Sequence, residues 1–237
     1  SITHPRVLII AGENSSATII QSYESLSVET VPYLTNVVTE IVAKQGSTLR
    51  HYRLQRENAN AYHIASTNTT MDRDANLASV TIDLGGGLAR HDQSVALAGS
   101  GANASLNGLF IGSGKRHIDN HTFIDHEVPD TTSNEVYKGI MTGASHGVFV
   151  GHVLVQKGAS RSVAHQVNKN LVLSGDAEID SQPKLEIFTD DVQCTHGAAI
   201  GRLDPTALFY LNSRGLDTLA AQELLIHGFV SQVTEAV

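Results

Sequence analysis

The residues best suited to chemistry lie between Asp190 and Gly215, where the chain holds its only cysteine, Cys194, and a histidine, His196, two positions later. If this stretch is a β-strand, residues two apart point to the same face, so the thiol and the imidazole lie side by side. This pair suits iron, zinc or copper. Because two ligands do not complete a site, we expect any further ligands to come from elsewhere in the chain or from another chain.

A second candidate is the histidine-rich segment Arg116 to Glu127. It has no HExxH motif, which excludes the zinc-protease helix, and no His-x-His pair of the kind expected in a cupin metal site. On a strand, His117 and His121 share a face with Asp119, whereas His126 points the other way. We therefore expect these histidines to be surface or turn residues, and as a group to contribute to a subunit interface rather than to catalysis.

Three other motifs fail on their spacing or composition. Gly112 to Arg116 lacks the first glycine and the Ser or Thr of a phosphate-binding loop. Gly143 to Gly147 does not have the G-x-S-x-G order of a hydrolase elbow. The carboxylates within Asp176 to Asp180 share a strand face, but with no Trp and few other aromatics a sugar-binding groove has little support.

The composition bounds the class of protein. The chain has 237 residues, of which 41% are hydrophobic and 17% charged, as in a globular protein. A formal net charge of −8 argues against a nucleic-acid or anionic-membrane surface. No apolar run is long enough to span a membrane, and Ser1 begins no signal peptide. One cysteine excludes an internal disulfide framework and suits a reducing compartment, so we expect the cytoplasm or a plastid stroma.

The first two hundred residues predict many short strands. Apolar clusters recur at roughly a dozen to fifteen residues, separated by Gly, Asn, Asp or Ser, and Gly85 to Gly87 predicts a tight turn. The segment Thr48 to Gln55 alternates imperfectly, with apolar residues at Leu49, Tyr52 and Leu54. Evenly spaced short strands are typical of a sandwich, a barrel or a β-solenoid, and the period alone does not choose among them.

The pattern becomes helical after Leu203. Asp204 followed by Pro205 predicts a helix start, and Gly215 predicts its end. Asp217 predicts the cap of a second helix, in which apolar residues repeat every four positions at Ala221, Leu225, Phe229 and Val233. Two helices with apolar stripes have to pack on the end of the β core or on a partner.

A family resemblance rests on several runs of residues. They are Asp190–Ala198, Leu208–Leu211, Ser213–Gly215, His165–Leu171 and His117–Thr122. Together they resemble the SufB/SufD family of the SufBCD iron–sulfur cluster assembly machinery, closely over roughly the second half of the chain and only in general texture over the first hundred residues. The resemblance implies a right-handed parallel β-helix over residues 1–202 and a C-terminal helical segment over 203–237.

The resemblance also implies a branch of the family and a site. His196 is followed by Gly197 and Ala198, where SufB-like chains carry His-Glu-Ala, and residues 167–171 lack the cluster-building cysteine of SufB. The chain is therefore similar to SufD and cannot supply that thiolate. In the SufB–SufD pair a histidine of SufD faces a cysteine of SufB, which implies His196 as a metal ligand, and Cys194 matches the neighbouring cysteine of the family.

By the same resemblance we expect a non-catalytic scaffold. It would form a transient iron–sulfur cluster at its interface with a SufB-like homologue, hold no cofactor tightly by itself, and dock a SufC-like ATPase through its C-terminal helices. An isolated chain could form a homodimer. The helical N-terminal region of the family is not visible in this sequence, which suggests a core fragment or a short homologue. The alternative is a metal-dependent or carbohydrate-active β-helix or cupin-like enzyme that uses residues His117 to Glu127.

Overall fold

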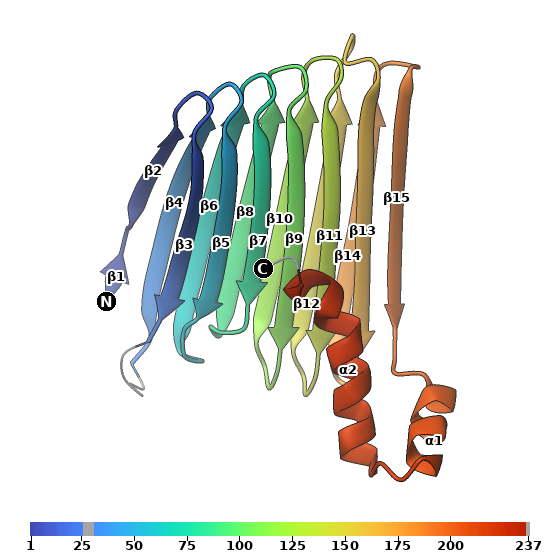
Figure 1. The fold of residues 1–237 in the computed structure, drawn as a ribbon. Coiled ribbons are helices and arrows are strands. Elements are labelled where there is room, and N and C mark those ends of the chain that lie inside the picture. The colour runs from blue at the N-terminus through green and yellow to red at the C-terminus, as the bar shows by residue number, and fades with distance from the viewer. Residues whose placement is uncertain (26–30, 236–237) are drawn as a thin grey trace.

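The chain winds into a solenoid of parallel β-strands (Figure 1). The computed structural model describes residues 1–25 and 31–235, which form fifteen strands and two helices. Successive strands after β3 alternate between two sheets, and all of the strand pairs are parallel. Asp119 pairs with Arg90, 29 residues earlier, so one coil of the solenoid takes about this length of chain.

Each sheet runs the length of the solenoid. Sheet A contains β1 (Ile2–Thr3), β2 (Arg6–Ala11), β4 (Tyr33–Ala43), β6 (Ala61–Met71), β8 (Leu88–Leu97), β10 (His117–His126), β12 (His146–Val155) and β14 (Glu178–Ile187). Sheet B contains β3 (Ser16–Glu24), β5 (Thr48–Arg56), β7 (Asn76–Asp83), β9 (Asn103–Gly112), β11 (Thr132–Met141), β13 (Ser162–Val172) and β15 (Val192–Gly201).

Of the three architectures that the strand spacing allowed, the molecule adopts the solenoid, and the expected parallel β-helix followed by C-terminal helices is confirmed. Short turns join the strands and stack from coil to coil. Gly86 has a φ of +78°, which confirms the turn expected at Gly85 to Gly87. At Gly143 (φ +72°) a side chain would lie 2.9 Å from the amide nitrogen of Gly114 in the preceding coil, so this stack requires glycine.

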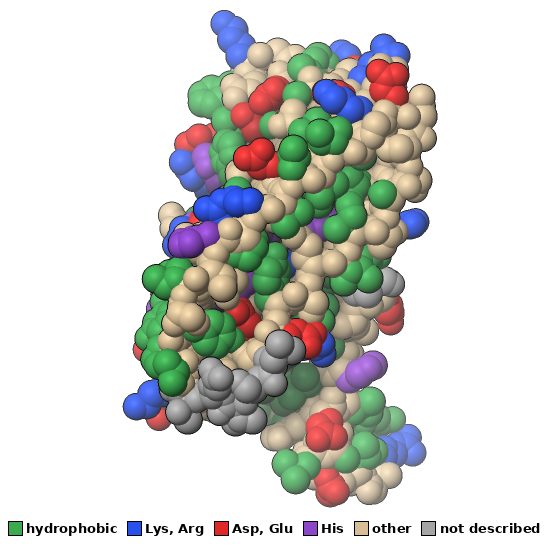
Figure 2. All heavy atoms as spheres, turned by 90° about the vertical axis from the view of Figure 1, so that its left-hand side faces the viewer, with side chains coloured by type: hydrophobic (Ala, Val, Ile, Leu, Met, Phe, Trp, Pro, Cys, Tyr) green, Lys and Arg blue, Asp and Glu red, His purple; other side chains and the backbone are tan. Residues whose placement is uncertain are grey.

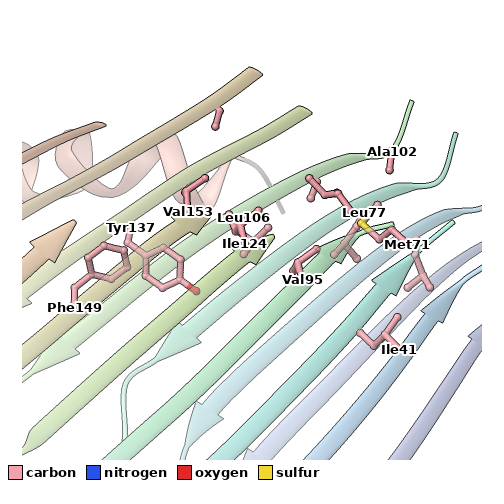
Figure 3. Close-up of a cluster of buried hydrophobic side chains, with 14 of the residues drawn as sticks. Ile41, Met71, Leu77, Val95, Ala102, Leu106, Ile124, Tyr137, Phe149 and Val153 are labelled. Carbon is pink, nitrogen blue, oxygen red and sulfur yellow. The ribbon is translucent and has the colours of Figure 1, made fainter. Parts of the chain in front are cut away.

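The inner faces of the two sheets meet in a continuous hydrophobic core (Figure 3). Leu77 and Leu106 of sheet B share this cluster with Met71 and Val95 of sheet A, and all four are almost fully buried. Burial of apolar surface is the main favourable contribution to folding, so these contacts hold the two sheets together.

The interior also contains a line of polar side chains beside the apolar ones. Arg53 on β5 forms an ion pair with Asp83 on β7, with 2.6 Å between Nη1 and Oδ1 and with both side chains 2% exposed. His91 on β8 lies 3.0 Å from the hydroxyl of Thr67 on β6. Burial, together with the charge of Arg53, holds the pKa of His91 well below its ordinary value. The solenoid is therefore wide enough to bury a polar layer as well as a hydrophobic one.

Two helices follow the strands: α1 (Pro205–Ser213) and α2 (Thr218–Thr234). Asp204 caps α1 by accepting a hydrogen bond from the Thr206 amide, and Asp217 caps α2 by accepting one from the Ala220 amide, each at 2.8 Å. Gly215 follows α1 with a φ of +95°. The three helix boundaries expected from the sequence are therefore confirmed. A division into separate units at residue 202 stays a prediction, and the last two residues of the expected helical segment lie outside the described residues.

Helix α2 turns back and packs on the outer face of sheet B (Figure 1). Val233 is fully buried in a cluster with Val80, Leu109 and Val136, which come from β7, β9 and β11. Lys138 on β11 donates a hydrogen bond of 2.6 Å from Nζ to the carbonyl oxygen of Phe229. The apolar stripe of α2 therefore packs on the outer face of sheet B.

Apolar side chains are exposed at both ends of the solenoid. At the N-terminal end, which Figure 2 views, apolar side chains of β1 to β3 such as Ile2, Leu8, Ile10 and Ile20 are exposed. At the other end lie β14 and β15, and β15 leads into the helices.

Candidate functional site

Cys194 and His196 both lie on β15, the last strand of sheet B. In the part of the chain that the structure describes, β15 pairs with β13 on one side and with no strand on the other. Cys194 is in register with Ala164 and His196 with Gln166, both of which point into the solenoid. The expectation that the thiol and the imidazole share one strand face is therefore confirmed, and that face continues the interior to an open edge.

Cys194 is the more shielded of the two. Its side chain is half-buried and packs against the hydrophobic core. Burial raises the pKa of the Cys194 thiol, and a hydrogen bond with the backbone of Ala164 offsets only part of this effect. The thiolate is the form that binds metals and attacks electrophiles, so burial of Cys194 disfavours its reactive form.

His196 is the accessible member of the pair. Its side chain is exposed at the open end of the solenoid, on a strand whose outer edge carries free backbone groups. A neutral imidazole is a common metal ligand, whereas a cysteine has to lose its proton before it binds a metal. His196 can therefore meet a group on a second molecule without a rearrangement of the core.

A column of buried polar residues lies directly behind His196. Glu135 on β11, Gln166 on β13 and His196 on β15 occupy matching positions of three neighbouring strands. The Gln166 side chain donates a hydrogen bond of 2.6 Å from Nε2 to Oε2 of Glu135, and both residues are fully buried. Burial raises the pKa of Glu135 to about 7, and contacts with Thr122 and Gln166 oppose it by less.

The residues that the structure describes do not by themselves form a complete metal site. Among residues 1–25 and 31–235, no group of three or more His, Cys, Asp or Glu side chains comes together in a way that could hold a metal ion. Cys194 and His196 are brought together, but a third ligand is not. The expectation that further ligands come from elsewhere in the chain or from another chain therefore stays a prediction.

The histidine-rich segment does not converge on a site either. His117 stacks edge-on with the ring of His146 at 4.9 Å, and His121 Nε2 lies 2.8 Å from Asp119 Oδ1. His126 points to the opposite face, as expected, but the expectation of a surface or turn position is wrong for it: the residue is fully buried, and its two ring nitrogens lie 2.8 Å from hydroxyl groups in the interior. The segment therefore offers ion-pair and packing partners on two different faces. His121 also lines a surface pocket with Asp92 and His152, but the described residues there form no group that could hold a metal ion, so the metal-dependent alternative gains no support from this geometry.

The serine of the Gly143 to Gly147 motif occupies a structural position. The hydroxyl of Ser145, within Gly143 to Gly147, is almost fully buried and donates a hydrogen bond of 2.9 Å to the carbonyl oxygen of Thr142. A serine buried in a turn cannot meet a substrate.

Both helices carry large apolar side chains that the β core does not cover. Phe209 and Tyr210 on α1 and Leu219 and Leu224 on α2 are exposed, Phe209 and Leu219 each at 73%. Large exposed hydrophobic side chains gathered on neighbouring elements are typical of an interaction surface. We call these four residues the helical apolar surface.

Glu135 and Gln166 are the residues near the site that the sequence did not single out. They are about 30 positions apart and a further 30 from His196, so only the register of the solenoid relates them. The regular coil length was the available signal, but it had to be combined with the correct pairing of strands.

Comparisons with known proteins point to one family. The family model described as "SUF system FeS cluster assembly, SufBD core domain" matches residues 1–229. The chain is 32% identical over 234 residues to the iron-sulfur cluster assembly protein SufD of Escherichia coli, covering 99% of this chain and 55% of that protein. It is also 32% identical over 242 residues to an iron-sulfur cluster assembly SufBD family protein of Synechocystis, covering 100% of this chain and 53% of the relative.

A plant relative extends this range. Protein ABCI7, chloroplastic, of Arabidopsis thaliana is 32% identical over 235 residues, which cover 99% of this chain and 49% of that protein. The chain therefore spans about half the length of the curated relatives it matches. The similarity also extends through the first hundred residues, where the sequence alone indicated only a general likeness. In the described part of the molecule, neither helix has the length and apolar character needed to cross a membrane.

Proposed function

The chain belongs to the SufBD family of the SUF iron–sulfur cluster assembly system and is SufD-like, and from this premise we propose that it is a scaffold subunit that holds one side of a nascent cluster through His196. One observation carries the proposal: His196 is exposed on an edge strand at the open end of the β-helix, beside the half-buried Cys194. The cluster is the cargo of this site and not a resident cofactor.

The ligand count supports an interface. Iron–sulfur clusters are held mostly by cysteine thiolates, about four for each cluster. This chain offers one cysteine with a raised pKa and one accessible histidine. A second, SufB-like subunit that pairs along the free edge of β15 would bring its own thiolate to His196. When that partner is missing, the same edge could pair with a second copy of this chain.

The same reasoning makes this subunit a scaffold without turnover of its own. No nucleotide-binding loop is present in the sequence, and the metal ligands are incomplete in the described structure. We assign the ATPase activity to a SufC-like partner that docks on the helical apolar surface. Because its relatives include a bacterial and a chloroplast protein, we expect this subunit to act in a cytoplasm or a plastid stroma.

The ligand role of His196 is tested in the complete assembly. The chain is co-expressed with a SufB-like homologue and a SufC-like ATPase, and the purified complex is reconstituted anaerobically with iron and sulfide. We expect His196→Ala to reduce the visible cluster absorption about tenfold or more, since even an outer partner of a metal ligand contributes this much to metal affinity.

The matched control is His165→Ala. His165 is an exposed histidine on β13, 2.7 Å from the Thr195 hydroxyl, on the outward face next to the site. It should leave the cluster absorption unchanged. Equal absorption for wild type and His196→Ala would show that His196 is not a ligand, and failure of the three chains to associate would remove the scaffold role.

The docking surface has its own prediction. Replacing Phe209 and Leu219 with Asp should weaken binding of the SufC-like ATPase by about 30-fold or more, because even one apolar anchor at the centre of an interface contributes about 2 kcal/mol. The dissociation constant is measured with the purified proteins. Ile20→Asp, which adds a charge at an equally exposed apolar residue at the other end of the solenoid, should bind like wild type. Equal weakening by both variants would argue against a specific surface on α1 and α2.

A further inference from the structure

The side-chain amide oxygen of Gln166 has no hydrogen-bond partner, and Gln166 is the neighbour of His196 on the adjacent strand. Its nitrogen donates to Glu135 at 2.6 Å, which fixes the orientation of the amide. Its oxygen, Oε1, is buried and has no hydrogen-bond partner within the described residues. An unsatisfied buried acceptor destabilises a fold, so the position of this oxygen calls for a donor.

The strand register supplies one candidate donor. Gln166 is flanked in sheet B by Glu135 on β11 and by His196 on β15. Strands of a sheet lie about 4.8 Å apart, and side chains in register stack along the ladder. Because Nε2 of the amide is already used toward Glu135, Oε1 remains free for a donor from the β15 side, where His196 occupies the matching strand position.

The opposite sheet is shaped to hold this amide in place. A Cβ atom at Gly151 on β12 would overlap Nε2 of Gln166 and the ring of Phe149. The glycine therefore leaves the space that the Gln166 side chain fills. Glu135 from one side and Gly151 from across the interior together define a single position for the amide.

We propose that Gln166, held by Glu135, is a positioning residue for His196: when the exposed imidazole turns toward the interior, Oε1 accepts a hydrogen bond from one ring nitrogen, and the other nitrogen is left facing the open end of the solenoid. A histidine that binds metal normally donates its second N–H to an acceptor of this kind, which fixes the tautomer and the orientation of the ring. This inference rests on the proposed function, since it explains how an exposed histidine on an edge strand is presented for binding. Gln166 touches no cargo itself and acts only through His196.

The test observes the histidine directly. The chain is labelled with ¹⁵N-histidine, and the ring nitrogen shifts of His196, assigned with His196→Ala, report which nitrogen carries the proton when the ring is neutral. In wild type we expect one predominant tautomer. Gln166→Met keeps the length of the side chain without the acceptor, and the shifts of His196 should move toward the mixture found in a free imidazole.

A second buried amide provides the control for general destabilisation. Gln93 on β8 donates to Ser79 at 2.8 Å and accepts from Tyr137 at 3.2 Å, away from β15. Gln93→Met should leave the His196 shifts as in wild type. If Gln166→Met does not fold, Gln166→Asn, which withdraws the amide by one methylene, takes its place. Unchanged His196 shifts in a folded Gln166 variant would overturn the proposal.

The readout separates this inference from the ligand role. The nitrogen shifts need neither iron nor a partner, so a normal cluster yield for His196→Ala would refute the ligand role and leave the positioning contact standing. In the reconstituted complex, Gln166→Met should also lower iron affinity by about tenfold or more, as for other outer partners of metal ligands. A shifted tautomer with unchanged iron affinity would overturn the claim that the contact serves binding.

Discussion

Asp83→Leu should destabilise the β-helix by about 3–5 kcal/mol. The carboxylate of Asp83 is the ion-pair partner of Arg53, and both side chains are 2% exposed. Removing one member of a buried pair leaves the other charge without compensation in a poorly polarisable interior. Since a domain is stable by about 5–15 kcal/mol in total, this loss is a large fraction. The free energy of unfolding is measured by urea denaturation.

The double variant Arg53→Met/Asp83→Leu is the decisive comparison. Replacing both members of a buried ion pair with apolar residues of similar volume is often nearly neutral. We therefore expect the double variant to regain most of the stability that Asp83→Leu loses. If the two variants are equally unstable, the cost comes from packing and not from an unpaired guanidinium.

The sequence predicted the strand-rich body because the solenoid repeats one simple unit. Each half-coil is a short strand followed by a turn, so apolar clusters return at nearly constant spacing, and the helix boundaries follow from the local chemistry of Asp204, Pro205, Gly215 and Asp217. The choice of a solenoid over a sandwich or barrel depends on which strands pair. Those pairs are about 30 residues apart, and no short window of sequence contains them.

The interior was harder to predict because it is partly polar. In Thr48 to Gln55 the imperfect alternation arises because His51 and Arg53 point inward, while Tyr52 points outward and packs against the cluster that α2 covers. Leu49 also points inward, so the apolar residues are divided between the two faces, and hydrophobicity alone does not identify the inner face of β5. A long strand ladder can satisfy buried polar groups from neighbouring coils, which a period of two along one strand does not reveal.

The candidate site was predicted in the same uneven way. Cys194 and His196 share a face because two-residue spacing on a strand requires it, and this needed no knowledge of pairing. Gln166 and Glu135 reach His196 only through the register of β11, β13 and β15. Local sequence thus identifies the exposed candidate, whereas the groups that would orient it come from the coiling of the chain.

Glu135→Gln should stabilise the protein above neutral pH and leave it unchanged in acid. Burial raises the pKa of Glu135 from 4.5 to about 7, so the folded state favours the protonated carboxyl. As the pH rises from about 4.5 to about 7, the unfolded chain releases this proton first, and the folded state loses stability until both forms are ionised. One pKa unit corresponds to about 1.4 kcal/mol, so the wild type should lose up to about 3 kcal/mol that the glutamine variant keeps.

The buried histidines act in the opposite direction, which makes the difference between the two proteins the informative quantity. Burial lowers the pKa of His51 and of His126 to about 4, so both destabilise the fold as the pH falls below about 6.5. This contribution is common to wild type and variant and cancels in the difference. Urea denaturation at pH 4 and at pH 8 should therefore give similar free energies of unfolding at pH 4 and a more stable variant at pH 8. A difference that does not change with pH would mean that Glu135 titrates in the folded protein as it does in the unfolded chain, and that the column behind His196 is open to water.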